Sequence, residues 1–258
     1  MNAAETSLMI TLVRRKNRPA CLLLPGAGGG LAHYFGLASH LGLGYNVYGV
    51  RPVGLLAGER PQDAIPAMVD SVLHELDRSE LVPELVFGWS LGGLLAWETC
   101  VRLADRGHRP RLMLVDSSPL ARVSTVDEDR RIEELIVRQL GPKAAPEARD
   151  RVARVFRGQV AALNEYRTTR EYDADVLLLR CTAPGAGIPD AAVRRWSELA
   201  PSLTTVSLRA GHFDVFDPEH ASALSEAVDG FLGAHQKLLV DGEFGRNPIL
   251  PAPGRNTR

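Results

Sequence analysis

One stretch decides the fold of this chain: Leu85-Val86-Phe87-Gly88-Trp89-Ser90-Leu91-Gly92-Gly93-Leu94-Leu95-Ala96-Trp97-Glu98. It has the pattern of a short apolar strand, a Gly-x-Ser-x-Gly turn and a helix with an apolar stripe, which is the context of a nucleophile elbow. Gly88 and Gly92 leave room for neighbouring backbone where any Cβ would clash, and Ser90 is held in a strained turn at a helix N-terminus. The helix amides and dipole favour negative charge that develops there during acyl transfer. Since a bare Gly-x-Ser-x-Gly also occurs in ordinary turns, the flanking strand and helix carry the argument.

Strands and helices alternate on both sides of this stretch. Apolar runs predict strands at 8–13, 20–24, 45–50, 110–115, 176–180 and 203–208, and helical spacing predicts helices at 31–41, 66–77 and 190–199. This alternation is typical of an α/β protein with a mostly parallel central sheet and helices on both faces. We expect one domain over residues 1–239, followed by a polar tail at 240–258, rich in Gly, Pro, Asn and Arg, that is disordered.

Residues 119–172 interrupt the alternation. They contain two amphipathic helices without a strand between them, one at 126–140 that stops at Gly141-Pro142, and one from Pro146 to about Tyr166. Two helices inserted in this way resemble a lid over the active-site end of the sheet. A helical decoration of the sheet edge is the alternative interpretation.

A serine nucleophile needs a general base, and the base needs a carboxylate that fixes its tautomer. Of the seven histidines, only His212 lies in a loop directly after a late strand, where the Ser, Asp, His order of this class of hydrolase places the base. The strand at 176–180 offers no acid until Asp190, whereas the strand after the elbow helix ends in Asp116. We therefore predict Ser90, Asp116 and His212 as the catalytic triad.

A glycine run, Pro25-Gly26-Ala27-Gly28-Gly29-Gly30, follows the strand at 20–24. Glycine loops can bind phosphate, but no Gly-Lys-Ser/Thr follows this one and no Gly-x-Gly-x-x-Gly frames it. We expect it to supply the second backbone amide of an oxyanion hole, from Ala27, beside the amide of Leu91. A plain strand-to-helix turn is the alternative.

Composition excludes several classes of function. With a net charge of -1 there is no basic excess to indicate nucleic-acid binding, and no apolar run approaches the ~20 residues of a membrane span. The N-terminus lacks the pattern of a signal peptide, so a cytoplasmic location is expected. Cys21, Cys100 and Cys181 have no metal-ligand spacing, and we expect them to be buried reduced thiols.

At this point the sequence resembles the thioesterase domains that end non-ribosomal peptide and polyketide synthases. The resemblance spans roughly residues 8–233, and Gly-Trp-Ser-Leu-Gly-Gly is its most specific element. Further matching stretches are 24–29, 50–55, 87–98, 103–107, Leu114-Val115-Asp116-Ser117-Ser118-Pro119 and Gly211-His212-Phe213. The match is closer to the terminal, product-releasing domains than to the separate proofreading thioesterases.

The resemblance implies an α/β-hydrolase fold and a serine hydrolase of secondary-metabolite or antibiotic biosynthesis. Ser90 would take an acyl chain from the phosphopantetheine arm of an acyl or peptidyl carrier protein and release it by hydrolysis or macrocyclisation. No metal and no cofactor of its own are expected. Since no additional N-terminal helices precede Leu8, we expect a monomer. The chain begins with methionine without an upstream carrier domain, so it is expected to be either an excised terminal domain or a free-standing enzyme.

Three readings of function remain. The leading one is the thioesterase; the second is a free-standing type II proofreading thioesterase or a small-molecule carboxylesterase on the same fold. The third is a hydrolase fold that serves only as a binding module, which the complete set of Ser90, Asp116 and His212 disfavours.

Overall fold

The computed structural model describes residues 6–185 and 187–244. Its centre is a seven-stranded sheet in the order β1-β3-β2-β4-β5-β6-β7. The strands are β1 (Met9–Val13), β2 (Ala20–Leu24), β3 (Asn46–Val50), β4 (Pro83–Trp89), β5 (Arg111–Val115), β6 (Val176–Cys181) and β7 (Leu203–Leu208). β1 pairs with β3 in the antiparallel sense, and the other pairings of the sheet are parallel. The predicted mostly parallel α/β sheet is thus present.

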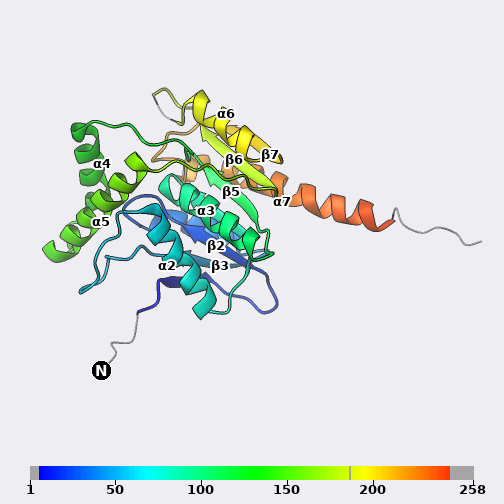
Figure 1. Cartoon of the computed structure of the whole chain (residues 1–258), viewed down its shortest axis with the longest axis horizontal. Helices are drawn as coiled ribbons and strands as arrows, with labels where there is room; N and C mark the ends of the chain where they lie inside the picture. The colour runs from blue at the N-terminus through cyan, green and yellow to red at the C-terminus, as the bar shows by residue number, and fades with distance from the viewer. Residues whose placement is uncertain (1–5, 186, 245–258) are drawn as a thin grey trace, which may run out of the picture.

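Helices cover both faces of this sheet (Figure 1). They are α1 (Phe35–Leu41), α2 (Ile65–Arg78), α3 (Leu91–Asp105), α4 (Val126–Gln139), α5 (Pro146–Glu165), α6 (Asp190–Leu199) and α7 (Ala221–Phe244), with short 3-10 turns at Ala32–Tyr34 and Pro218–His220. Side chains of β2 alternate between two cores: Leu22 and Leu24 pack in the core shared with α2, α3 and α6, and Leu23 in the one shared with α1 and α7. Because both faces are buried, the central strands are almost continuously apolar.

Element boundaries follow the local signals closely, with two differences. The helix expected at 31–41 begins with the 3-10 turn Ala32–Tyr34 before α1. At the other end, α7 continues to Phe244 and so includes residues 240–244 of the predicted tail, whereas 245–258 lie outside the described residues. Gly107 follows α3 with φ 86°, as expected for the residue after a helix C-terminus.

The insertion predicted at 119–172 folds as α4 and α5, which lie together at one end of the molecule (Figure 1). A capping box begins α4: Thr125 Oγ1 accepts from Glu128 N at 3.2 Å, and Glu128 Oε2 accepts from Thr125 N at 2.8 Å. Arg157 of α5 donates two hydrogen bonds to Glu133 of α4, at 2.7 and 2.6 Å. The two helices are therefore joined to each other by charge as well as by packing.

α5 rests on the loop that follows β3. Arg151 Nε donates to the carbonyl of Leu55 at 2.9 Å. Gly158 lies so close to the carbonyl of Gln62 that a Cβ would come within 2.7 Å of that oxygen. Because loops after parallel strands gather at their carboxyl ends, the insertion covers the edge of the sheet where functional residues are expected.

Candidate active site

Ser90 occupies a strained turn between β4 and α3. Its backbone has φ 54° and ψ -122°, outside the usual regions for a residue with a side chain, and its amide donates to the carbonyl of Val115 at 2.9 Å. The turn requires its two glycines: a Cβ on Gly88 would lie 2.1 Å from the carbonyl oxygen of Gly92, and a Cβ on Gly92 would lie 2.0 Å from that of Leu24. The strain at Ser90 is therefore fixed by close backbone packing.

Ser90, His212 and Asp116 form a chain of hydrogen bonds. His212 Nε2 lies 3.1 Å from Ser90 Oγ, and His212 Nδ1 lies 2.6 Å from Asp116 Oδ2. Ser90 directly follows β4, Asp116 directly follows β5, and His212 lies in the loop after β7. Parallel strands thus bring the three residues to one edge of the sheet although 122 residues separate Ser90 from His212. The geometry is that of a nucleophile, a base and a carboxylate that orients the base.

The carboxylate of Asp116 is held in place on its other side. Asp116 is 2% exposed, and its Oδ1 accepts hydrogen bonds from the amides of Cys181 and Ile188, each at 3.2 Å. Amide donors stabilise an ionised carboxylate inside the protein. The end of β6 and the loop after it thus contribute one amide each to the site, which the search for an acidic side chain in that segment did not find.

Trp89 contacts both the backbone and the ring of His212. Its indole nitrogen donates to the carbonyl of His212 at 3.1 Å, and its ring lies over the imidazole with centroids 5.1 Å apart. Gly26 contacts the same ring so closely that a Cβ would lie 2.4 Å from Trp89 Cε3. Sequence reasoning assigned Trp89 no role, although its position directly before Ser90 at the end of β4 was a usable signal.

The glycine loop turns beside the start of α3. Gly29 N donates to the carbonyl of Gly26 at 3.0 Å, which closes a four-residue turn, and Gly28 at its third position has φ 87°. Gly26 N donates to the hydroxyl of Tyr34 at 3.0 Å. Since Gly92, the second residue of α3, packs against the carbonyls of Leu24 and Pro25, the turn lies next to the first turn of α3. The backbone amides of Ala27 and Leu91 thus come from two neighbouring segments, as an oxyanion hole requires.

The remaining histidines have other surroundings. His33 contacts Gln139, His40 pairs with Asp229 at 2.8 Å, and His220 lies 3.7 Å from Asp214. His74 and His108 are exposed on the surface. Among the residues whose side chains the structure describes, His212 is the histidine brought to Ser90.

The thiols are buried and free, as predicted for Cys21, Cys100 and Cys181. Burial raises the pKa of all three thiols. For Cys181, which lies beside the site, burial and then the nearby charge of Asp116 raise the pKa to about 12. A thiol of this kind stays protonated at neutral pH, so it is not a reactive nucleophile.

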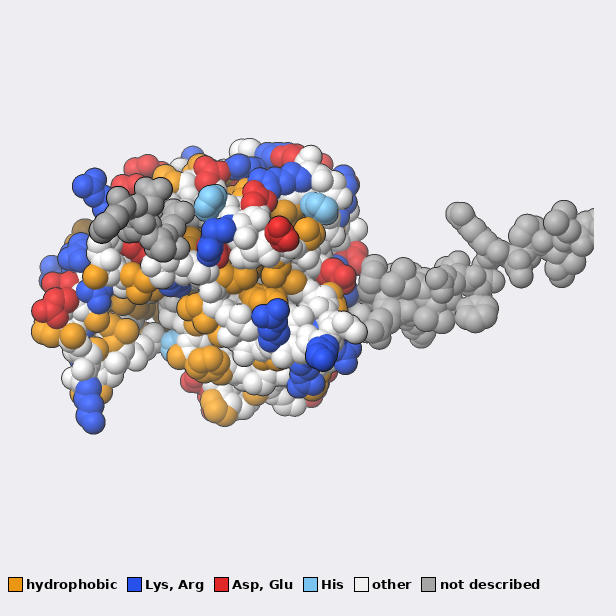
Figure 2. Space-filling model, turned by 90° about the horizontal axis from the view of Figure 1, so that it is seen from below, with side chains coloured by type: hydrophobic (Ala, Val, Ile, Leu, Met, Phe, Trp, Pro, Cys, Tyr) orange, Lys and Arg blue, Asp and Glu red, His pale blue; other side chains and the backbone are white. Residues whose placement is uncertain are grey.

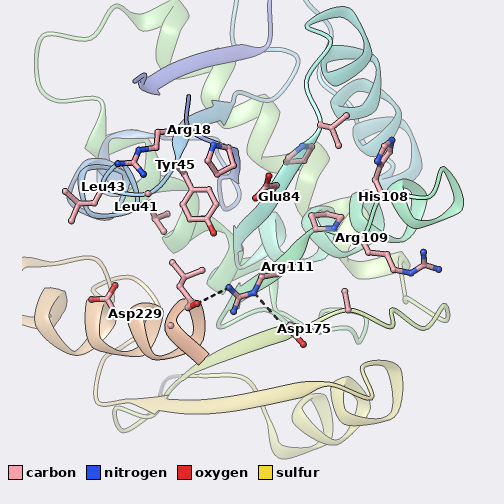
Figure 3. A pocket seen from close by; sticks show the side chains of 18 of the residues that line it. Arg18, Leu41, Leu43, Tyr45, Glu84, His108, Arg109, Arg111, Asp175 and Asp229 are labelled. Carbon is pink, nitrogen blue, oxygen red and sulfur yellow. Dashed lines mark hydrogen bonds and ion pairs between the residues drawn. The ribbon is translucent and has the colours of Figure 1, made fainter. Parts of the chain in front are cut away.

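A large open cavity of about 1160 Å³ lies at the opposite end of the sheet, between the starts of β4 and β5 and helix α7 (Figure 3). Arg111 points into it, donates to the carbonyls of Phe231 and Leu232, and lies 3.8 Å from Asp175. Two more of its charged lining residues form ion pairs: His40 with Asp229, and Arg109 with Asp173. Arg111 thus connects β5 to α7 at this cavity, which is separate from the triad.

The surface shows charges of both signs. Figure 2 presents one face on which Lys and Arg lie among Asp and Glu around a more hydrophobic middle, without a basic stripe. Over 6–185 and 187–244, no group of three or more His, Cys, Asp or Glu side chains is placed to hold a metal ion. No helix in the same residues is long and apolar enough to cross a membrane.

Comparisons with known proteins agree with this geometry. A model of the thioesterase domain family matches residues 20–238. A stretch of 110 residues is 33% identical to indigoidine synthase of Streptomyces lavendulae; it covers 42% of this chain and only 8% of that much longer protein.

Two solved structures share the fold. The RedJ thioesterase from the prodiginine pathway of Streptomyces coelicolor is 25% identical, with a TM-score of 0.69 over 83% of this chain and 86% of its own. The Vlm2 thioesterase domain, solved with a bound dodecadepsipeptide, is 21% identical, with a TM-score of 0.70 over 86% of this chain and 96% of its own. The sheet and its helices are thus of the α/β-hydrolase type found in these thioesterases. With most of its length matched by the family model, the chain belongs to the thioesterase domain family.

Proposed function

We propose that this protein releases a peptidyl or polyketide acyl chain from the phosphopantetheine thioester of a carrier protein, through an acyl-enzyme on Ser90. The observation that carries the proposal is the hydrogen-bonded chain from Ser90 Oγ through His212 to Asp116, with distances of 3.1 and 2.6 Å, at the start of α3. Synthases and thioesterases of secondary metabolism among the similar proteins support the choice of substrate class.

In the first half-reaction, His212 Nε2 accepts the proton of Ser90 as Oγ attacks the thioester carbonyl carbon. The carbonyl oxygen becomes an oxyanion that the amides of Ala27 and Leu91 stabilise by hydrogen bonding. When the tetrahedral intermediate collapses, the carbon–sulfur bond breaks, and His212 donates its proton to the departing pantetheine sulfur. Asp116 stays ionised and stabilises the imidazolium that forms in between.

In the second half-reaction, His212 takes a proton from the incoming nucleophile, which attacks the ester on Ser90. Water gives a free acid, whereas an amine or hydroxyl of the acyl chain itself gives a macrocycle. In both cases the proton returns to Ser90 as the ester bond breaks. The helices α4 and α5 cover this edge of the sheet, and we assign them the role of a lid that shapes the acyl pocket.

A small-molecule carboxylesterase, which shares the same triad and amides, is the second candidate. The leaving group separates the two: a thioesterase prefers pantetheine thioesters to oxygen esters of the same acid. We would therefore incubate the protein with matched acyl-pantetheine thioesters and oxygen esters, and record the masses of the intact protein and of the products. Faster acylation by thioesters supports the thioesterase, and turnover of oxygen esters alone supports the carboxylesterase.

Ser90→Ala is the control for both candidates. It removes the nucleophile but keeps the strained backbone and the packing of Gly88 and Gly92, so we expect the adduct and turnover to disappear while thermal unfolding changes little. A Ser90→Ala protein that keeps near-wild-type turnover would show that another residue is the nucleophile. Product mass then distinguishes a free acid from a cyclic product, which is lighter by one water.

A further inference from the structure

Gln159 is a polar residue on the buried face of α5. Val152, Val155, Phe156 and Val160 line this face, and Gln159 is 3% exposed among them. Its side-chain Oε1 accepts a hydrogen bond from the backbone amide of Gly28 at 2.7 Å, across 131 residues of sequence. A buried side-chain amide with such a partner is a specific contact, because leaving the Gly28 amide unpaired would be costly.

This contact fixes the backbone next to Ala27. The peptide before Ala27 is held by the bond from Gly29 N to the carbonyl of Gly26, at 3.0 Å. The peptide after Ala27 carries the Gly28 amide, which Gln159 holds. The direction of the Ala27 N–H is therefore set from both sides. One of the two bonds lies within the turn, and the other comes from Gln159 of the inserted helices.

The inserted helices touch the turn at a second point. Ile136 of α4 packs on Gly28, where a Cβ would lie 2.5 Å from Ile136 Cγ2. Glu133 and Arg157 join α4 to α5, so the contacts through Ile136 and Gln159 belong to one unit. If α4 and α5 shift away from the sheet, the glycine turn loses both contacts.

We propose that Gln159 is a positioning residue that couples the seating of α5 to the oxyanion hole: the Ala27 amide points at the reacting oxygen only while Gln159 holds Gly28. This inference rests on the proposed function, because it gives the Ala27 amide its oxyanion role. Gln159 does not touch the reacting atoms and acts through the turn. Acyl-enzyme formation is thereby favoured when the inserted helices cover the site.

The test uses Gln159→Met, which keeps the length of the side chain and removes the acceptor, together with Gln159→Leu. We expect kcat for a pantetheine thioester to fall roughly 10- to 100-fold, as for a misdirected oxyanion donor, with KM changed less than about 3-fold. The pH midpoint of kcat should stay at the wild-type value, because the bonds among Ser90, His212 and Asp116 are untouched. Gln139→Ala is the control, since this exposed glutamine of α4 hydrogen-bonds to the ring of His33, at 3.0 Å, and should keep the wild-type rate.

Two readouts separate positioning from packing. The affinity for a trifluoromethyl ketone analogue of the acyl group, which forms a tetrahedral adduct on serine, should fall in parallel with kcat. Hydrogen exchange of the Gly28 amide, followed by NMR, should be slow in the wild-type protein and faster in the Gln159→Met protein. The exchange measurement needs no activity. The Ser90 amide, which donates to the carbonyl of Val115, should stay as slow as in wild type, and faster exchange at both amides would indicate a general loss of stability.

A Gln159→Met protein with wild-type kcat, wild-type adduct affinity or an equally slow Gly28 amide would overturn the inference. Ser90→Ala, measured alongside, keeps this result distinct from a failure of the proposed function. An inactive Ser90→Ala protein with an unaffected Gln159→Met protein refutes only the positioning role. An active Ser90→Ala protein refutes the proposed function itself.

Discussion

Asp116→Asn replaces one oxygen of a carboxylate that has three hydrogen-bond partners. Oδ1 accepts from the amides of Cys181 and Ile188, and Oδ2 faces His212 Nδ1. The asparagine can keep its carbonyl oxygen on the two amides, in which case its NH₂ group faces the imidazole. In the reverse orientation the NH₂ group faces two amide donors, which leaves them unpaired at a cost of about 1–3 kcal/mol each.

The first orientation therefore prevails, and it changes the tautomer of His212. An NH₂ group donates to Nδ1, so the proton of the neutral ring moves to Nε2, the atom that must accept the proton of Ser90. The reverse orientation restores the tautomer but costs about 2–6 kcal/mol from the two unpaired amides. Since each factor of ten corresponds to about 1.4 kcal/mol, we expect kcat/KM to fall by a factor between about 30 and about 2 × 10⁴.

The assay is the release of pantetheine thiol from an acyl-pantetheine thioester, with thermal unfolding recorded on the same samples. The Asp116→Asn protein should remain folded, because its carbonyl still accepts both amides. Asp214→Asn is the matched control: Asp214 accepts the amide of Gly211 in the same loop as His212, and an asparagine oxygen can replace it there. A kcat/KM within tenfold of wild type for Asp116→Asn, or an equal loss for Asp214→Asn, would refute the reasoning.

Two further predictions concern stability. Gly92→Ala places a Cβ 2.0 Å from the carbonyl oxygen of Leu24, so it should lower the free energy of unfolding by more than about 3 kcal/mol or prevent folding. Gly230→Ala places a Cβ with nothing within 4 Å, so it should be neutral or stabilise α7 by up to about 1 kcal/mol. Urea unfolding of both proteins checks this, and equal stabilities would contradict it. Burial alone would raise the pKa of the Glu59 carboxyl, but hydrogen bonds from Arg51, Gly54 and Leu56 outweigh burial and hold the pKa below its ordinary value. The stability that Glu59 contributes is therefore complete above the ordinary glutamate pKa of about 4.3 and is lost as pH falls through the lower folded-state value. The difference in unfolding free energy between wild type and Glu59→Gln should be largest near neutral pH and shrink in acid, and a difference that grows in acid would contradict the assignment.

Much of this fold can be predicted from sequence because its signals are local. The strand before Ser90 carries the apolar run 85–87, the turn has its two glycines, and Gly107 follows the helix after it. Parallel topology then supplies the long-range step, because residues that follow neighbouring strands meet at one edge of the sheet. That rule was enough to select Asp116 and His212, which the structure brings to Ser90.

Contacts between distant segments could not be predicted in the same way. The bond between Gln159 and Gly28 depends on how α5 is placed, and spacing along a helix does not fix that placement. The sequence did contain one indication of this contact. Gln159 occupies a position in the apolar stripe of α5, where a buried polar side chain needs a hydrogen-bond partner. The contact of Trp89 with the carbonyl of His212 likewise depends on the path of a loop that has no periodic pattern.

The end of β6 and the loop that follows it support Asp116 through main-chain amides, those of Cys181 and Ile188. Any residue type except proline provides such an amide, so the side chains at 182–185 are free of the chemistry although they lie beside it. The backbone is less free, because a Cβ on Gly187 would come within 2.0 Å of the carbonyl of Cys181. For redesign of the enzyme, this segment is therefore a site for sequence libraries of fixed length: residues 183 and 184 can be varied to alter the rim of the site, with proline left out at 183, where the amide donates to Ala210. Thr182, whose hydroxyl donates to the carbonyl of Leu208, and the positive-φ glycines Gly185 and Gly187 are kept.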